Sequence, residues 1–179
     1  MYSFVNLEKY NYSERFQNIE MIIFSFAGFF IPFFVGHPQI LVGTFVNAFL
    51  ILAGLHFKGY RALPVILMPS LGVLSRGLIF GPYTIYLVLM IPFIWIGNAL
   101  LVYTFRRFKI SYWLNLTLGI ALKTSFLFGT AYLLYLAGVL PVIFLTTMGI
   151  LQVTTALLGG ILVFSYEKIM INSRKYYIK

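Results

Sequence analysis

Apolar segments alternate along the chain with short turns that contain glycine, proline or charged residues. We distinguish six segments, at residues 20–35, 39–56, 62–80, 83–105, 112–138 and 141–166. A helix needs about 20 predominantly apolar residues to cross a bilayer. The first and third segments are short, and tilt or interfacial ends must supply the missing length. The pattern predicts an all-α integral membrane protein with six transmembrane helices.

The predicted spans form one transmembrane domain with a short segment on either side. The domain covers residues 20–170, and neither a fixed-period repeat nor a low-complexity tract divides it. Residues 1–19 are polar, and they form either an interfacial helix on the membrane surface or a plain polar leader. Residues 171–179 form a basic, aromatic tail, which suits the anionic headgroups of a cytoplasmic surface.

The basic residues test the number of spans independently. If the N-terminus is cytoplasmic, eleven of the 13 Lys and Arg residues fall on the inner side and none falls in an outer turn. Cytoplasmic loops carry an excess of Lys and Arg, and a missing span would destroy this separation. The sequence therefore predicts a multi-pass protein of the cell membrane with both termini cytoplasmic. The eleven residues are Lys9, Arg15, Lys58, Arg61, Arg106, Arg107, Lys109, Lys168, Arg174, Lys175 and Lys179.

Composition agrees with a membrane protein and excludes several other classes. The chain is 61% hydrophobic and 9% charged, whereas a soluble domain has about 25% charged residues. A net charge of +9 would suggest nucleic acid in a soluble domain. Here the positive-inside rule and lipid headgroups explain that charge, so we expect no nucleic-acid partner. The absence of cysteine excludes thiolate metal sites, iron–sulfur clusters and disulfides.

The chain also lacks the residue sets of common catalytic sites. It contains no Asp, and its two histidines, His37 and His56, are predicted on opposite sides of the membrane. They cannot share a metal or one general-base role. No nucleotide-binding motif is present, so energy from ATP would have to come from another chain. We expect no enzymatic activity, no metal and no cofactor.

All four acidic residues lie outside the spans or at their ends, which bears on the kind of transport. Transporters driven by protons or sodium usually need a carboxylate at membrane depth. Backbone carbonyls at a broken helix can also hold sodium, so this argument weakens ion coupling without removing it. The four are Glu8, Glu14, Glu20 and Glu167.

Two cations fall inside predicted spans, Arg76 near the outer end of the third and Lys123 near the middle of the fifth. An uncompensated Arg near mid-bilayer costs about 2.5–3.5 kcal/mol. Three interpretations of Arg76 remain open. It snorkels to outer-leaflet phosphates, hydrogen-bonds to carbonyls freed at Pro69 or Gly81-Pro82, or binds an anionic group of a ligand. Together the two cations favour a ligand that carries a carboxylate or phosphate.

Further polar residues complete a candidate substrate-binding site. Asn47 and Asn98 have an alternative role in hydrogen bonds between helices, worth about 0.6–2 kcal/mol. Gln152, on a helix that enters from the outside, is a pocket candidate. His37 either caps a site or belongs to a plain polar turn. The full predicted set consists of Arg76, Lys123, Gln152, Tyr83, Thr84, Asn47, Asn98 and His37.

Small residues recur at four-residue spacing late in the chain, as Thr155 with Gly159 and Ala156 with Gly160. Such a stripe lets another helix approach closely. Two interpretations stay open, namely packing within the bundle and contact with a partner membrane protein.

The segment "PSLGVLSRGLIFGP" and the final "MGILQVTTALLGGILVFSYEK" resemble the substrate-binding (S) components of energy-coupling factor transporters over roughly residues 20–170. The resemblance implies a six-helix S-component-like bundle that binds a vitamin or related micronutrient from the outside. It also implies a transmembrane coupling protein and two cytoplasmic ATPases as partners. Many members carry Ala-x-x-x-Ala on the first helix, where this chain has "SFAGFF", so a dedicated partner or another docking surface is an alternative.

These observations predict a membrane specificity subunit that binds a small anionic micronutrient from the outside for ATP-driven uptake. The expected partners are that solute, membrane lipid and the coupling and ATPase subunits. Two rival functions stay open, namely a non-catalytic anchoring subunit of a larger membrane complex and a stand-alone facilitator.

Overall fold

The computed structural model describes residues 12–35, 37–80, 83–108 and 110–177, excluding the side chains of residues 78–80, 84 and 171–177. Every regular element in these ranges is a helix, which confirms the predicted all-α class for the described chain. The elements are α1 (Glu14–Phe34), α2 (Gln39–His56), the short 3-10 helix η1 (Gly59–Ala62), α3 (Leu63–Phe80), α4 (Thr84–Arg107), α5 (Tyr112–Leu136), α6 (Ile143–Met148) and α7 (Ile150–Tyr177).

Helix length and composition suit a membrane protein. Among the residues whose side chains are described, five stretches are long and apolar enough to cross a membrane. The third predicted span corresponds to α3, whose last three side chains are not described. The count of six spans therefore stays a prediction. The five stretches are Glu14–Phe34, Gln39–His56, Ile85–Arg107, Tyr112–Leu136 and Ile143–Met170.

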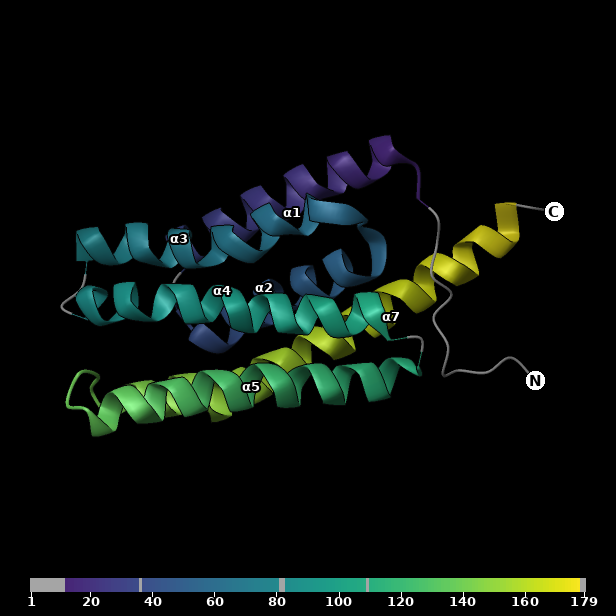
Figure 1. Cartoon of the computed structure of the whole chain (residues 1–179). Coiled ribbons are helices and arrows are strands. Elements are labelled where there is room, and N and C mark those ends of the chain that lie inside the picture. Colours follow the sequence, from purple (N-terminus) through teal and green to yellow (C-terminus); the bar gives the residue numbers. More distant parts are fainter. Residues whose placement is uncertain (1–11, 36, 81–82, 109, 178–179) are drawn as a thin grey trace.

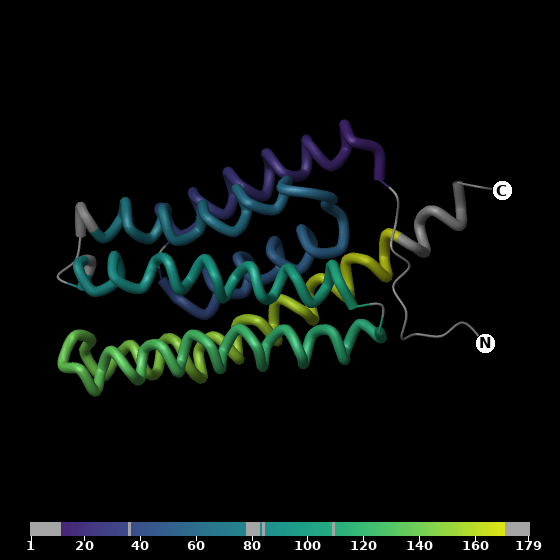
Figure 2. The backbone as a smooth tube through the Cα atoms, viewed as in Figure 1, coloured from purple at the N-terminus to yellow at the C-terminus, as the bar shows by residue number. Residues whose placement is uncertain are grey.

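The long helices run back and forth along one bundle axis, and consecutive long helices are antiparallel (Figures 1 and 2). α1 and α3 lie along one side of the bundle, α5 and α7 along the other, and α2 and α4 between them (Figure 1). The start of α1 and the end of α7 lie at the same end, which we call the terminal end. The ends of α1, α3 and α5 lie at the opposite end, the turn end.

Helix packing is closest in three pairs, α1 with α3, α2 with α7, and α4 with α5. A Cβ added to Gly72 would collide with the backbone carbonyl of Phe29, so α1 and α3 touch backbone to backbone there. Gly159 lies against the backbone of α2, and Gly160 lies against Leu116 of α5. The small-residue stripe of α7 therefore serves packing within the bundle, which decides between the two interpretations.

Several boundaries differ from the hydropathy pattern for local reasons. α1 begins six residues before the predicted span at residue 20, because Ser13 caps it and accepts a hydrogen bond from the Phe16 amide at 3.3 Å. The last predicted span is divided at Gly149 into α6 and α7. Gly59, with φ of 60°, starts η1 in the left-handed region that favours glycine. The suggested interfacial helix lies largely within residues 1–11, outside the described residues.

Candidate functional site: a polar chamber among the long helices

A small chamber of about 150 Å³ lies between the long helices, and every one of them contributes to its wall. Its wall is apolar over Pro32, Val42, Val73 and neighbouring residues, but polar side chains converge on it from five elements. Ligand sites commonly combine apolar walls with a few placed polar groups. The polar lining residues are Gln39, Asn47, Ser70, Asn98, Lys123, Gln152 and Thr155.

Among the described residues that line this chamber, Lys123 has the only charged side chain. It is 2% exposed, and its Nζ donates a hydrogen bond of 2.7 Å to Asn47 Oδ1. Asn47 Nδ2 in turn donates to the Gly43 carbonyl at 2.9 Å and to Thr155 Oγ1 at 3.0 Å. The side chains of α5, α2 and α7 thus form one hydrogen-bonded chain, which fixes the ammonium position.

The charge on Lys123 has no acidic counterpart in the described structure. The ion pairs found among the described residues join Glu20 and Glu167 to His56, and Glu14 to Arg61. An ammonium group can donate three hydrogen bonds, and Asn47 Oδ1 accepts the one that the structure shows for Lys123. A buried cation without an anion is unfavourable, and an anionic group beside Nζ would offset that cost.

A second cavity of about 390 Å³ adjoins the chamber toward the turn end of the bundle. The two cavities share five lining residues, which makes them neighbours: Gln39, Val73, Leu87, Met148 and Gln152. We call the second cavity the vestibule. It is lined also by His37 and Tyr83, both exposed residues. The vestibule therefore lies between the turn end and the chamber that contains Lys123.

Six of the eight predicted site residues meet in this region. Lys123, Asn47, Asn98 and Gln152 line the chamber, while His37, Tyr83 and again Gln152 line the vestibule. The amides of Asn47 and Asn98 also make the alternative contacts expected between helices, since Asn98 Nδ2 donates to the Ile66 carbonyl at 3.1 Å. The backbone of Thr84 begins α4, but its side chain lies outside the described residues.

Arg76 has a different environment from Lys123 and is not among the lining residues of either cavity. Its Nη1 donates to the carbonyls of Phe33 and Phe34, at 3.3 and 3.2 Å. These carbonyls belong to the last turn of α1, where no intrahelical donor is available and a cation is favoured. Of the three interpretations, the structure shows hydrogen bonding to carbonyls, at the end of α1. Gly81-Pro82, one of the two places predicted for such carbonyls, lies outside the described residues.

Three polar lining residues were not in the predicted set. Gln39 begins α2, and Thr155 lies on α7. Ser70 accepts a hydrogen bond of 2.6 Å from Trp95 Nε1 and donates one of 2.9 Å to the Leu67 carbonyl. Their position on inward faces becomes evident only when the helices are packed, because polar residues within apolar segments do not reveal which face they occupy.

A second polar cluster, at the terminal end, was not predicted at all. His56 Nδ1 lies 2.9 Å from Glu20 Oε2, and His56 Nε2 lies 2.8 Å from Glu167 Oε1. All three side chains are buried, and Tyr12 packs against the imidazole with ring centroids 4.6 Å apart. The antiparallel helix order could have indicated it, since α1 starts, α2 ends and α7 ends at that side. Each His56 nitrogen faces a different carboxylate, so the cluster is an ion-pair bridge between helices. No group of residues that could hold a metal ion was found among the described residues.

Chemically, the chamber combines the buried ammonium group of Lys123 with the side-chain amides of Asn98 and Gln152, a donor set suited to an anionic group. The described residues around it include no carboxylate or histidine that could act as a general base next to Lys123. In comparisons with protein families, curated proteins and solved structures, no match to this chain was found.

Proposed function

We propose that this chain is the substrate-binding subunit of a membrane importer, and that it holds a small anionic solute in the chamber. In this proposal the chain crosses the membrane six times with both termini in the cytoplasm. A transmembrane coupling protein and two cytoplasmic ATPases, all separate chains, supply the energy for uptake. The solute is of micronutrient type, as the resemblance to S components implies.

The observation that carries this proposal is the environment of Lys123. Its ammonium is buried, held by Asn47 and without an acidic partner among the described residues. Ionisable residues inside a membrane protein usually mark a functional site. A solute carboxylate or phosphate beside Nζ would supply the missing negative charge, while the side-chain amides of Asn98 and Gln152 would donate further hydrogen bonds to it.

The position of the vestibule supports capture from the outer side. The vestibule includes His37 and Tyr83, next to the ends of α1 and α3, at the turn end of the bundle. With cytoplasmic termini, this end faces outward, and the basic residues of the other turns lie at the terminal end. The chamber volume of about 150 Å³ supports a small ligand. A larger ligand would place its anionic group in the chamber and the rest of the molecule in the vestibule.

The experiment that tests the proposal compares Lys123→Met with Arg76→Gln. Each change removes one cation, but only the first removes a chamber residue, because Arg76 lines neither cavity. Gently purified protein is denatured and the released small molecules are measured by mass spectrometry. We expect the unchanged protein and Arg76→Gln to release one anionic solute in stoichiometric amount, and Lys123→Met to retain at least tenfold less.

Other outcomes assign the protein to its rivals. Release of phospholipid alone from the unchanged protein, together with a stable non-ATPase partner, would support an anchoring subunit. Solute transport by the purified protein in liposomes without ATPases would support a facilitator. An undiminished solute in folded Lys123→Met protein would refute the role of Lys123.

A further inference from the structure

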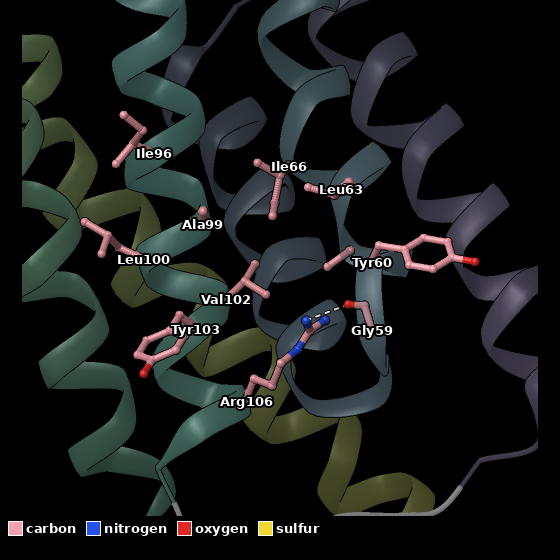
Figure 3. A pocket seen from close by; sticks show the side chains of 11 residues that line it. Gly59, Tyr60, Leu63, Ile66, Ile96, Ala99, Leu100, Val102, Tyr103 and Arg106 are labelled. Carbon is pink, nitrogen blue, oxygen red and sulfur yellow. Dashed lines mark hydrogen bonds between the residues drawn. The ribbon is translucent and has the colours of Figure 1, made fainter.

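A separate apolar groove runs between α3 and α4 at the terminal end, on a different part of the bundle from the chamber (Figure 3). Its volume is about 590 Å³, within the range of about 300–1,000 Å³ that is usual for small-molecule sites. One wall comes from α4, and the other from η1 and the start of α3. The α4 residues are Ile96, Ala99, Leu100, Val102, Tyr103 and Arg106.

Small residues keep the groove open. Gly59 and Ala62 of η1 lie on one side, and Ala99 lies on the other (Figure 3). Ile96, Ala99, Tyr103 and Arg106 recur at helical spacing, so they share one face of α4. The groove is therefore a continuous feature along more than two turns of α4, with aliphatic side chains in its length and one guanidinium at its end.

Of the lining residues that the structure describes, only Arg106 has a charged side chain. Its Nη1 donates a hydrogen bond of 2.7 Å to the Gly59 carbonyl, which holds the guanidinium across the gap between α4 and η1 (Figure 3). A guanidinium matches a phosphate in geometry and charge. Other basic residues lie near this end of the groove: Lys58 and Arg61 in and beside η1, and Arg107 at the end of α4.

The rim of the groove is exposed and apolar. Leu63, Ile96 and Tyr103 are 52%, 47% and 50% exposed, and Tyr60 beside Arg106 is 82% exposed. On helices that cross a membrane, exposed apolar residues face lipid tails, and Tyr is enriched where tails meet headgroups. The groove thus opens toward the bilayer, with its apolar length at tail depth and its charged end at headgroup depth.

We propose that this groove is a binding site for one anionic phospholipid of the cytoplasmic leaflet. One acyl chain lies between α3 and α4 along Ile66, Ile96 and Leu100, and the headgroup phosphate lies against Arg106. Basic pockets between transmembrane helices on the cytoplasmic side are suited to such headgroups. A water-soluble ligand does not match, because nearly the whole lining is aliphatic or aromatic. The inference is independent of any solute in the chamber.

The test uses the full-length protein in detergent micelles, titrated with phosphatidylglycerol and, separately, with zwitterionic phosphatidylcholine. Native mass spectrometry counts the lipid molecules that each protein retains. We expect one tightly retained phosphatidylglycerol and at least tenfold weaker retention of phosphatidylcholine. Arg106→Gln should weaken the retention of phosphatidylglycerol at least tenfold. The matched control is Arg107→Gln, which removes the same charge from the adjacent, exposed position and should weaken it less than threefold.

A second pair of variants tests the apolar part of the site without changing charge. Ala99→Phe fills the groove, whereas Ala121→Phe adds the same bulk at an exposed position of α5. Only Ala99→Phe should displace the retained phosphatidylglycerol, and helix content measured by circular dichroism shows that each variant is folded. If Arg106→Gln and Arg107→Gln lowered phosphatidylglycerol retention equally, the lipid would be attracted to the basic surface in general, and the proposal would be overturned. Unchanged retention by folded Ala99→Phe would also overturn it.

Discussion

At the scale of single residues, Glu20, His56 and Glu167 form a buried, hydrogen-bonded cluster at the terminal end. With both carboxylates ionised, an imidazolium donates at both nitrogens, as the distances of 2.9 and 2.8 Å require. The three residues come from α1, α2 and α7, so one side chain joins the first and last long helices. Removing one partner from a buried charged group is strongly unfavourable.

We therefore expect Glu167→Gln to lower the free energy of unfolding by about 1.5–3 kcal/mol, the usual contribution of a hydrogen bond to a charged group. Glu14→Gln is the matched control, because the Glu14 side chain is 85% exposed and 3.6 Å from Arg61. That change should stay within about 0.5 kcal/mol, as for most surface substitutions. Unfolding of each variant by sodium dodecyl sulfate, followed by circular dichroism, gives the comparison. Equal stability of the two variants would show that the cluster does not hold the helices together.

At the scale of helices, close approach depends on glycine at the contact points. At Gly72 any side chain would meet the Phe29 carbonyl of α1, whereas a Cβ at Gly129 of α5 would meet nothing within 4 Å. In α5 the glycine only adds freedom to the unfolded chain. The same residue type therefore has opposite effects on stability in the two helices, and hydropathy alone does not distinguish them.

Gly72→Ala should separate α1 from α3 and destabilise the protein by about 1–3 kcal/mol, the range for overpacked sites. Gly129→Ala should stabilise it by about 0.4–1 kcal/mol, because alanine reduces the conformational entropy of the unfolded chain. Thermal unfolding of both variants and the unchanged protein, all in one detergent, measures the two changes in stability. A neutral Gly72→Ala would contradict the backbone contact between the two helices.

At the scale of the whole molecule, membrane orientation determines what each end of the bundle can contact. The start of α1 and the end of α7 share one end (Figure 1), which requires an even number of crossings if every long helix spans the membrane. The proposed orientation, which follows the positive-inside rule, makes this end cytoplasmic. In that orientation the vestibule opens outward, and the groove with Arg106 lies in the inner leaflet.

Single cysteines can test this orientation directly, because the chain has no cysteine of its own. Val139 and Arg107 are both exposed, in the turn after α5 and at the end of α4. A membrane-impermeant maleimide should label Val139→Cys in intact cells, and should label Arg107→Cys only after the membrane is opened. The reverse labelling pattern would invert the proposed orientation and place the vestibule inside.

The sequence by itself determined the helical class and most helix positions, and it placed Arg76 near the end and Lys123 near the middle of a predicted span. These properties follow from local quantities, namely the length of apolar segments, the turn residues and the position of charge along the chain. Lys123 was predicted as deeply placed because it stands in the middle of a long apolar segment, and it is 2% exposed. Asn47, Asn98 and Gln152 were predicted as substrate-binding candidates because they are polar residues in apolar surroundings.

Only the tertiary structure decided which of these residues meet. Lys123 contacts Asn47 across 76 positions of the chain, and His56 contacts Glu167 across 111, so neither pair follows from helical spacing. Arg76 contacts carbonyls of α1 because α1 and α3 pack closely, a contact set by Gly72 and not by any charge pattern. Hydropathy is a property of single segments, whereas a site arises from the faces that segments turn toward one another.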